Sequence, residues 1–300
     1  MDFRYNQVLN EELSNADCGS IVVSFGVLND LVAPYLAKFG NEEQKQKYLA
    51  SMNAGDTIGC LAMTEPGAGS DLAGMRTFAK KDGDHYVLNG TKIFISNGMM
   101  ADFALVAAIT DPSKGRAGVS MFIVDADLEG FTKAGPLQKV GLKAQDTAEL
   151  NFDNVRVPAE NLLGEEGQGF IYLMQNLPQE RISIAIMAAA AMESVLDVTL
   201  QYTKERKAFG QPIGTFQHNK FKMAEMVTKV EVTEAYIDDC VAAHAEGKLS
   251  AVDAAKAKWW AAQVQCDVLD ECVQLHGGYG YMNEYRVARA WRSEEHTSEL

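Results

Sequence analysis

The sequence predicts an α+β protein of several domains, with helices at both ends of the chain and β-strands between them. Apolar residues recur at helical spacing up to about residue 55, and short apolar runs separated by turn residues follow up to about residue 160. Long helical patterns begin after the glycine-rich segment 164–169. We therefore expect an N-terminal helical segment, a middle antiparallel β-barrel or sandwich, and a C-terminal up-down four-helix bundle.

The boundaries of the predicted domains follow these changes in pattern. Residues 1–56 form a partial N-terminal helical domain, residues 57–163 the middle β domain, and residues 164–292 an incomplete helical bundle. The polar end, 293–300, has no apolar period and is expected to be a non-native tail that arose from a frame or assembly artefact. No charged segment followed by an apolar run opens the chain, so no signal peptide is predicted.

The N-terminal segment carries a helical pattern that ends at a glycine. Its apolar positions recur at i, i+3, i+4, i+7 and i+8, namely Leu28, Leu31, Val32, Tyr35 and Leu36. Pro34 falls within this pattern and is tolerated best if the helix begins just before it. We expect Gly40 to end the helix and Asn41 to cap the next one.

The middle segment contains a strong hairpin signal. Asn89-Gly90 lies between the apolar runs 86–88 and 92–95, and Asn-Gly in that setting is typical of a tight β-turn. Three further strands are predicted at 104–109, 119–124 and 148–152.

The C-terminal segment predicts four helices, at 170–176, 178–206, 216–246 and 251–275. Ser250 and Asp253 have the spacing of a capping box at the start of the last one. Gly277 and Gly278 are expected to end that helix.

Composition excludes several classes of function. The formal net charge is −14, whereas nucleic-acid binding requires clustered Lys and Arg. Five cysteines without CxxC spacing indicate free thiols in a reducing compartment. The almost wholly apolar stretch 182–192 is too short to span a membrane. The histidines lack metal-ligand spacing, so no metal site is predicted.

A glycine-rich loop, TEPGAGSD at residues 64–71, is the first candidate for a binding site. Its glycines allow the backbone to approach a ligand closely, and Thr64, Ser70 and the backbone amides offer hydrogen-bond donors. The spacing of its glycines differs from the dinucleotide fingerprint, and no βαβ unit surrounds it. An ordinary connection between two strands is the alternative interpretation.

The segment LPQER at residues 177–181 supplies a candidate catalytic carboxylate. Asn176 is expected to cap a helix here, with Pro178 in its first turn. An acid in a first turn commonly complements the helix dipole, which is the simpler interpretation of Glu180. The alternative is a general base that faces a pocket, with Arg181 as a neighbouring charge partner.

Two further motifs lie at helix ends. The segment RKAFGQPI, residues 206–213, and the following FQ offer an arginine fork and aromatic rings that can hold a pyrophosphate and stack on a ring. A cation that complements the helix dipole, followed by a turn, is the alternative. The segment QLHGGYGY, residues 274–281, fits either a helix cap or close backbone contact with a ligand.

These segments together resemble the acyl-CoA dehydrogenase family. The resemblance rests on LAMTEPGAGSD, NGTKIFISNG, ERKAFGQPI with FQ, and QLHGGYGY, in that order, and extends from about residue 10 to Arg292. It implies an N-terminal helical domain, a middle β domain and a C-terminal four-helix bundle, with FAD between the β domain and the bundle. Relative to the family, the chain is expected to be truncated at both ends.

The resemblance also implies which residues hold FAD. The flavin-loop positions are Leu61, Ala62, Met63, Thr64, Gly69 and Ser70, with Ser70 also on the CoA side. The positions that pack against the isoalloxazine ring are Phe94, Ile95 and Ser96. The positions that hold the FAD of a neighbouring subunit are Arg206, Phe209, Phe216 and Gln217, with pyrophosphate contacts from Gln274, Gly277 and Gly278. Since each cofactor site then draws on two chains, a homo-oligomer is implied, either a dimer or a tetramer.

The sequence around LPQER is similar to that of the long-chain branch of the family, which carries its base in an x-x-x-E-R pattern. By that resemblance Glu180 is the catalytic base and Arg181 a substrate contact. The implied reaction is FAD-dependent α,β-dehydrogenation of a fatty acyl-CoA thioester to trans-2-enoyl-CoA, in which Glu180 removes the pro-R α proton and the β hydrogen leaves as hydride to flavin N5. Electrons then pass to an electron-transferring flavoprotein. The implied location is the bacterial cytoplasm, or the mitochondrial matrix if a transit peptide precedes this chain.

Three alternatives stay open. An acyl-CoA oxidase shares the first half-reaction but passes electrons to oxygen, and rapid peroxide formation would identify it. A non-catalytic scaffold of helices and strands would purify as a colourless protein. A truncated, inactive family member would lack the C-terminal segment whose backbone amide contacts the thioester carbonyl in the family, and it would bind FAD poorly.

Overall fold

The computed structural model describes residues 2–293, so the expected non-native tail lies outside the described residues except for Ser293. The internal contacts divide the chain into two compact units. The sheet unit comprises residues 23–139 and 143–177, and the bundle unit comprises residues 2–22, 140–142 and 178–293. The predicted fold class is confirmed, because helices occupy both ends of the chain and a β-sheet lies between them in sequence. The three-domain division stays a prediction.

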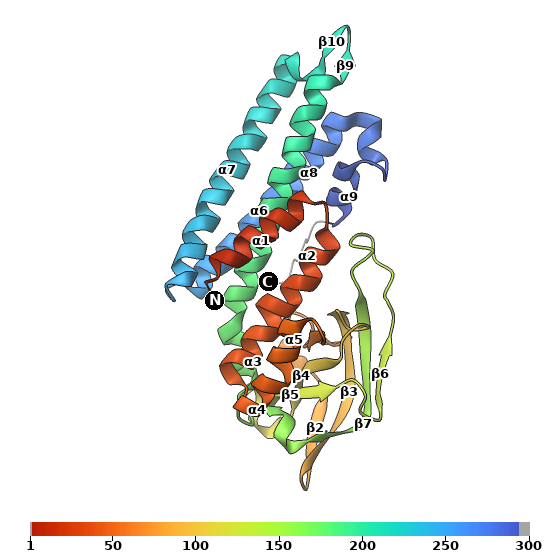
Figure 1. Ribbon diagram of the computed structural model, residues 1–300, viewed down its shortest axis with the longest axis vertical. Helices are drawn as coiled ribbons and strands as arrows, with labels where there is room; N and C mark the ends of the chain where they lie inside the picture. The colour runs from red at the N-terminus through yellow and green to blue at the C-terminus, as the bar shows by residue number, and fades with distance from the viewer. Residues whose placement is uncertain (1, 294–300) are drawn as a thin grey trace. The chain divides into compact units, whose positions relative to one another are not determined.

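The sheet unit is built on one eight-stranded sheet (Figure 1). Its strands are β1 Gly59–Ala62, β2 Phe78–Asp82, β3 His85–Ser96, β4 Phe103–Ile109, β5 Val119–Asp125, β6 Phe131–Ala134, β7 Thr147–Pro158 and β8 Leu162–Leu163. Hydrogen bonds connect them in the order β6-β7-β3-β2-β4-β5-β8, and β1 pairs with β4. Strands β4, β5 and β7 contain the three strands predicted after the Asn-Gly signal.

The sheet is mixed and open, so the closed barrel, one of the two arrangements expected for this domain, is absent, and two strand pairs are parallel where antiparallel pairs were expected. Strand β1 runs parallel to β4, from Gly59 beside Phe103 to Ala62 beside Val106. Strand β2 also meets β4 in parallel, whereas the other neighbouring pairs are antiparallel. Parallel pairing requires a crossover, and the chain between β1 and β4, which includes β2 and β3, provides it. Among the described strands, β6 and β8 end the order and do not pair with each other.

Helices that precede the sheet in sequence cover one of its faces. They are α2 Gly19–Gly26, of which only the part from Val23 belongs to this unit, α3 Ala33–Phe39, α4 Glu42–Gln44 and α5 Ala50–Ala54, with π-helical turns at Val27–Val32 and Lys45–Leu49. On β4, Phe103, Leu105 and Ala107 pack in a cluster with Tyr35 and Leu36. The alternate residues Ala104, Val106 and Ala108 belong to a second cluster on the other face. The period of two in a strand thus produces two cores, one against helices and one within the folded sheet.

Local signals in the N-terminal segment are confirmed except at Pro34. Asn41 caps α4 in a full capping box, since its side chain accepts from the Gln44 amide and the Gln44 side chain accepts from the Asn41 amide. Gly40 ends α3 because its backbone is extended, with φ −70° and ψ 145°. A Cβ there would lie 2.5 Å from the Leu36 carbonyl oxygen, so this conformation requires glycine. The helical run as a whole does not begin just before Pro34: α3 begins at Ala33, but the π-helical turn Val27–Val32 directly precedes it and joins it to α2.

The predicted hairpin at Asn89-Gly90 is wrong. Both residues lie inside β3, where Gly90 has φ +149° and marks a register shift against β7. A Cβ at Gly90 would lie 2.4 Å from Thr77 Oγ1, so glycine is needed there for close packing and for the unusual φ. The turn between β2 and β3 falls instead at Gly83, which has φ +62°.

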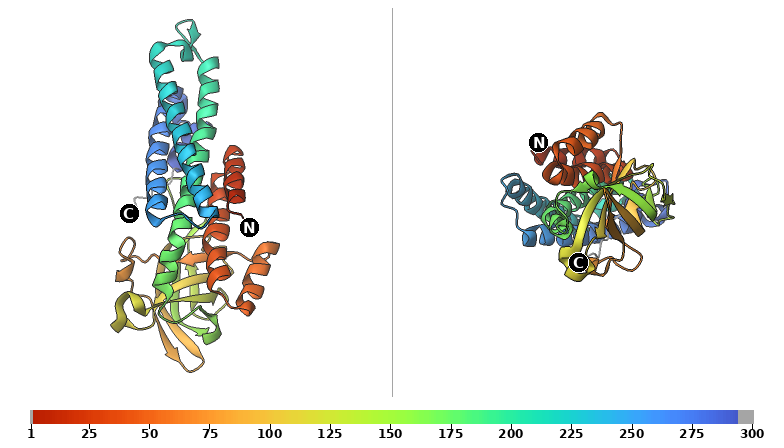
Figure 2. Two further views of the ribbon diagram at one scale, coloured as in Figure 1. Left: turned by 90° about the vertical axis from the view of Figure 1, so that its left-hand side faces the viewer. Right: turned by 90° about the horizontal axis from the view of Figure 1, so that it is seen from below.

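The bundle unit is built on three long helices that run side by side in Figure 1 and in the left view of Figure 2. They are α6 Gly169–Glu205, of which the part from Pro178 belongs to this unit, α7 Gln217–Ala245 and α8 Ala251–His276. The N-terminal helix α1 Arg4–Asn15 packs against α7, and the short α9 Arg286–Ser293 packs against α8. The described residues thus supply three long helices of the predicted four-helix bundle.

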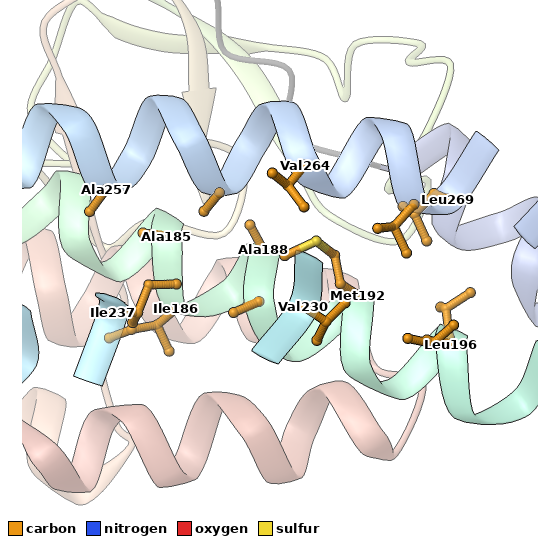
Figure 3. Packing of buried hydrophobic residues seen from close by; sticks show 14 of the residues in the cluster. Ala185, Ile186, Ala188, Met192, Leu196, Val230, Ile237, Ala257, Val264 and Leu269 are labelled. Atoms are coloured by element: carbon orange, nitrogen blue, oxygen red, sulfur yellow. The ribbon is translucent and has the colours of Figure 1, made fainter. Parts of the chain in front are cut away.

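Small and branched side chains from all three long helices form the bundle core (Figure 3). Helix α6 contributes Ala185 and Met192, α7 contributes Val230, and α8 contributes Ala257 and Val264. The alanines let the helices approach closely, and the larger side chains fill the remaining space. The predicted cap of α8 is confirmed, since Ser250 Oγ accepts from the amide of Asp253 at 3.0 Å.

Two predicted helices, 170–176 and 178–206, are one helix. Helix α6 is 37 residues long and contains Pro178 in its interior. Asn176 is therefore no N-cap: it is fully buried inside α6, and its Oδ1 accepts from Lys38 Nζ at 2.6 Å. Proline removes one helical hydrogen bond, and the burial of α6 residues such as Leu173 and Ile182 in the cores of the two units compensates for that loss.

Two helical segments are long and apolar enough to span a membrane when only length and composition are considered: Gly19–Phe39 and Gly169–Glu205. The apolar window of the second segment is 67% buried, as expected for a helix that forms the core of a bundle. This composition is therefore weak evidence for a membrane span.

Four carboxylates line a cavity of about 350 Å³ in the bundle unit. They are Glu11 of α1, Glu193 of α6, and Glu234 and Asp238 of α7. Burial and the neighbouring charges of Glu193, Asp238 and Glu11 raise the pKa of Glu234 to about 7. A raised carboxyl pKa means that the folded state binds the proton more tightly than the unfolded state, so stability falls as the pH rises from about 4.5 through 7.

Replacing Glu234 by Gln should therefore stabilise the protein in alkaline solution. We expect Glu234→Gln to raise Tm by a few degrees at about pH 8, with a difference that shrinks toward zero near pH 4.5, because the neutral amide avoids the repulsion. Thermal unfolding across this pH range measures the effect, with the exposed Asp239→Asn on the same helix as the control. An equal Tm difference at both ends of the range would contradict the explanation.

Candidate active site

The glycine-rich loop leaves the end of β1 and exposes its backbone. Leu61 and Ala62 are buried in β1, and Met63 and Thr64 follow at the start of the loop. Backbone hydrogen bonds between Glu65 and Ala68, of 2.9 and 3.1 Å, close a tight turn. Gly69 and Ser70 are exposed beyond this turn, and no atom lies within 4 Å of a Cβ built on Gly69. The loop therefore offers a ligand accessible amides and hydroxyls.

The aromatic position of β3 is exposed and conformationally strained. Phe94 has φ +62° and a relative exposure of 66%, at a bulge between Lys92 and Ile95. Non-glycine residues in this region cost about 1–3 kcal/mol and concentrate at functional sites. Ile95 is buried, Ser96 is half-buried, and the amide of Ile93 donates to the Thr64 carbonyl at 2.9 Å. The structure thus brings the predicted flavin loop and the predicted ring-packing segment together.

A pocket of about 440 Å³ lies in the bundle unit where α6 and α8 end. Four predicted residues line it: Arg206, Gln274, Gly277 and Gly278. Both glycines are exposed and have open space where a Cβ would point. A guanidinium, a side-chain amide and accessible backbone amides form a donor set that suits a pyrophosphate.

Tyr202, His276 and Tyr279 also line this pocket. His276 and Tyr279 belong to the motif QLHGGYGY but were not predicted to contact FAD, and Tyr202 lies outside the motifs. Tyr202 stacks on His276 with ring centroids 4.1 Å apart, and the Arg206 guanidinium lies 5.3 Å from the Tyr279 ring centroid. Burial lowers the pKa of His276, and its Nδ1 lies 2.8 Å from the Cys272 carbonyl oxygen. Since a carbonyl oxygen can only accept, His276 Nδ1 donates to Cys272, and this hydrogen bond fixes the end of α8. The signal available in the sequence was the place of Tyr202, one helical turn before Arg206.

The connection from α6 to α7 displays aromatic rings. It contains the small hairpin of β9 Lys207–Ala208 and β10 Gln211–Pro212. Phe209 lies at its tip with φ +51° and a relative exposure of 95%, and it meets Phe216 edge-to-face at 6.1 Å. Gln217 is exposed as the first residue of α7. These three residues form a second group in the bundle unit and do not belong to the lining of the pocket at the ends of α6 and α8.

Glu180 is buried in the interior of α6, with a relative exposure of 7%. The helix begins at Gly169, so position 180 lies about three turns from its start. The dipole of a helix terminus acts only within its first or last turn, and the first turn of α6 contains no acid. The simpler interpretation of Glu180 as a dipole residue is therefore wrong. Arg181, the next residue, is half-buried.

The residues of each unit fit parts of an FAD molecule. In the sheet unit, an exposed ring held at positive φ and an open glycine backbone suit a planar, carbonyl-rich group. In the bundle unit, the donors around Gly277 and Gly278 suit a pyrophosphate, and Phe209 offers a free ring face. Among residues 2–293, no group of three or more His, Cys, Asp or Glu side chains is placed to hold a metal ion.

Three domain models of one family match the chain. They are the acyl-CoA dehydrogenase N-terminal domain at residues 1–56, the middle domain at 60–155 and the C-terminal domain at 167–297. The mitochondrial long-chain specific acyl-CoA dehydrogenase of Sus scrofa is 48% identical over 283 residues, which is 94% of this chain. The chain spans only 65% of the length of that relative.

Solved structures agree with this assignment. The crystal structure of an acyl-CoA dehydrogenase from Geobacillus kaustophilus matches 98% of this chain and 78% of its own, with a TM-score of 0.96 and 48% identity. A glutaryl-CoA dehydrogenase from Mycobacterium smegmatis, in complex with FADH2, matches 98% of this chain and 75% of its own, with a TM-score of 0.92 and 32% identity. The order of the motifs, the fold and these relatives agree, and the chain belongs to the FAD-dependent acyl-CoA dehydrogenase family.

Proposed function

We propose that the protein catalyses the α,β-dehydrogenation of fatty acyl-CoA thioesters to trans-2-enoyl-CoA, with FAD as cofactor and Glu180 as the base. The observation that carries this proposal is the burial of Glu180 in the middle of α6. An ionisable side chain that is buried in the middle of a helix is a candidate for a catalytic role, and no role at a helix end accounts for this one. The sequence pattern LPQER and the family relationship support the same assignment.

FAD would be held by the residues that the sequence motifs predict. The sheet unit would supply Leu61 to Thr64, Gly69 and Ser70 together with Phe94, Ile95 and Ser96. The bundle unit would supply Arg206, Phe209, Phe216, Gln217, Gln274, Gly277 and Gly278 to the FAD of a neighbouring subunit. Bound FAD would accept the β hydrogen as a hydride, a step for which amino-acid side chains have no equivalent.

The chain's own chemistry would be a proton transfer. Glu180 would remove the α proton of the thioester, and Ser70 and Arg181 would contact the substrate. Such a proton is a very weak acid in water, so the thioester carbonyl must be polarised and water excluded for a carboxylate to remove it. General-base catalysis of this kind typically contributes about 10² to 10⁴ in rate.

The same proposal implies an oligomeric state, an electron acceptor and a cellular location. The enzyme would be a homo-oligomer, because residues at the ends of α6 and α8 would complete the cofactor site of another subunit. Its electrons would pass to an electron-transferring flavoprotein, in the bacterial cytoplasm or the mitochondrial matrix. Transfer to oxygen is the alternative, and fast oxygen-dependent peroxide formation during turnover would establish an acyl-CoA oxidase instead.

Replacing the base should abolish turnover without loss of the cofactor. We expect Glu180→Gln to retain FAD and to lower kcat by about 10² or more, because the amide cannot accept the α proton. Turnover with an artificial electron acceptor measures the effect, and the exposed Asp197→Asn on the same helix serves as control. Normal turnover in Glu180→Gln would remove Glu180 from this role.

Removing the predicted pyrophosphate donor should weaken cofactor binding. Charge-assisted hydrogen bonds contribute about 1.5–3 kcal/mol, so Arg206→Gln is expected to raise the Kd for FAD by about one to two orders of magnitude. Titration of the apoprotein with FAD, followed by flavin fluorescence, measures this change. The neighbouring exposed Lys204→Gln should bind FAD like the unaltered protein, and an unchanged Kd in Arg206→Gln would contradict the assignment.

A further inference from the structure

Lys92 is a cation that is fully withdrawn from water inside the sheet unit. Its Nζ lies 2.8 Å from Glu65 Oε1, and the two side chains have relative exposures of 0% and 6%. Lys92 belongs to β3, and Glu65 belongs to the glycine-rich loop. Neither residue is among those predicted to contact FAD or substrate, so the role of this pair needs its own explanation.

The pair connects several segments through hydrogen bonds. Lys92 Nζ also donates to the Met63 carbonyl at 2.9 Å, so the ammonium holds the chain on both sides of Thr64. The Glu65 carboxylate accepts from the amides of Arg76 at 2.6 Å and Thr77 at 3.0 Å. One carboxylate therefore ties the two ends of the glycine-rich segment 66–75 to each other, and one ammonium ties its start to β3.

The pair also lies next to the strained aromatic position. Lys92 is the last residue of β3 in regular register with β7, where it pairs with Leu150, before the bulge that contains Phe94. Between them, the amide of Ile93 donates to the Thr64 carbonyl at 2.9 Å. The loop and the bulge are thus held at adjacent points of the same strand.

We propose that Glu65 and Lys92 are a positioning pair that fixes the glycine-rich loop and the Phe94 bulge relative to each other, so that together they present a preformed surface to the flavin. This proposal rests on the proposed binding of FAD by these segments. A loop with open glycines has many accessible conformations, and ordering it only on binding would weaken affinity. The ion pair orders the loop before FAD binds.

The electrostatics agree with a charged pair. Burial raises the pKa of the Glu65 carboxyl, but hydrogen bonds from Lys92, Thr77 and Arg76 outweigh it, and the net shift is downward. Burial lowers the pKa of Lys92, and Glu65 opposes that change. Apolar residues of similar size often stabilise a fold as well as a buried ion pair does, so stability alone gives little reason for these charges. Their directed hydrogen bonds fix the geometry of the loop, which non-directional apolar contacts would not do.

Stability and positioning can be separated with three variants. Glu65→Leu and Lys92→Met each leave one buried charge without its partner, and both should lower Tm and weaken FAD binding at least tenfold. The double variant contains neither charge, so its Tm should recover relative to Glu65→Leu. It also lacks the directed hydrogen bonds, so its FAD affinity should stay at least tenfold below that of the unaltered protein.

Amide hydrogen exchange of the FAD-free protein measures the order of the loop directly. We expect the amides of Arg76, Thr77 and segment 66–75 to exchange at least tenfold faster in the double variant. The matched control is Asp82→Asn with Arg156→Gln, which removes an exposed ion pair of 2.8 Å in the same unit and should change neither property. A double variant that binds FAD like the unaltered protein, or that shows unchanged exchange, would overturn the positioning role.

The two proposals can fail separately. If the unaltered protein does not bind FAD, the proposed function fails, while exchange in segment 66–75 still reports on whether Glu65 and Lys92 order the loop. If the unaltered protein binds FAD and the double variant binds it equally well, the positioning role fails and the proposed function stands.

Discussion

The arrangement of the sheet unit depends on a pair of opposite charges held out of water. Glu65 and Lys92 occupy a place where neither could remain charged alone, and each has hydrogen-bond partners in addition to the other. Through these contacts the start of the glycine-rich loop, its return at Arg76 and Thr77, and strand β3 share one fixed geometry. The exposed ring of Phe94 keeps its unfavourable backbone conformation within that frame.

Signals that depend only on neighbouring residues were predicted well from the sequence. Asn41 and Ser250 cap helices as expected, because a cap is a hydrogen bond within one turn. The prediction of a turn at Asn89-Gly90 was wrong, because Gly90 serves a different purpose there. Thr77, which is distant in sequence, packs against Gly90 and leaves no room for a side chain. Pro178 suggested a helix start, yet α6 continues through it, since packing along a 37-residue helix outweighs one lost hydrogen bond.

The candidate site shows the same division between local and distant information. The order of the motifs predicted the family and four of the ten residues that line the pocket, namely Arg206, Gln274, Gly277 and Gly278. The motif that contains Lys92 could not show that this side chain is buried. A strand pattern does not indicate which residue distant in sequence would pair with a buried lysine. Nor could the segment LPQER show that Glu180 lies deep inside a helix, which depends on the helix having begun at Gly169.

In the proposed reaction, the buried carboxylate on α6 would remove a proton from an acyl-CoA and FAD would accept the hydride. Anaerobic addition of a long-chain acyl-CoA to the FAD-loaded protein tests it most directly, with the visible absorbance of the flavin as the readout. We expect rapid loss of the oxidised flavin absorbance at one equivalent of acyl-CoA per bound FAD. A flavin spectrum that stays unchanged in excess acyl-CoA would contradict it.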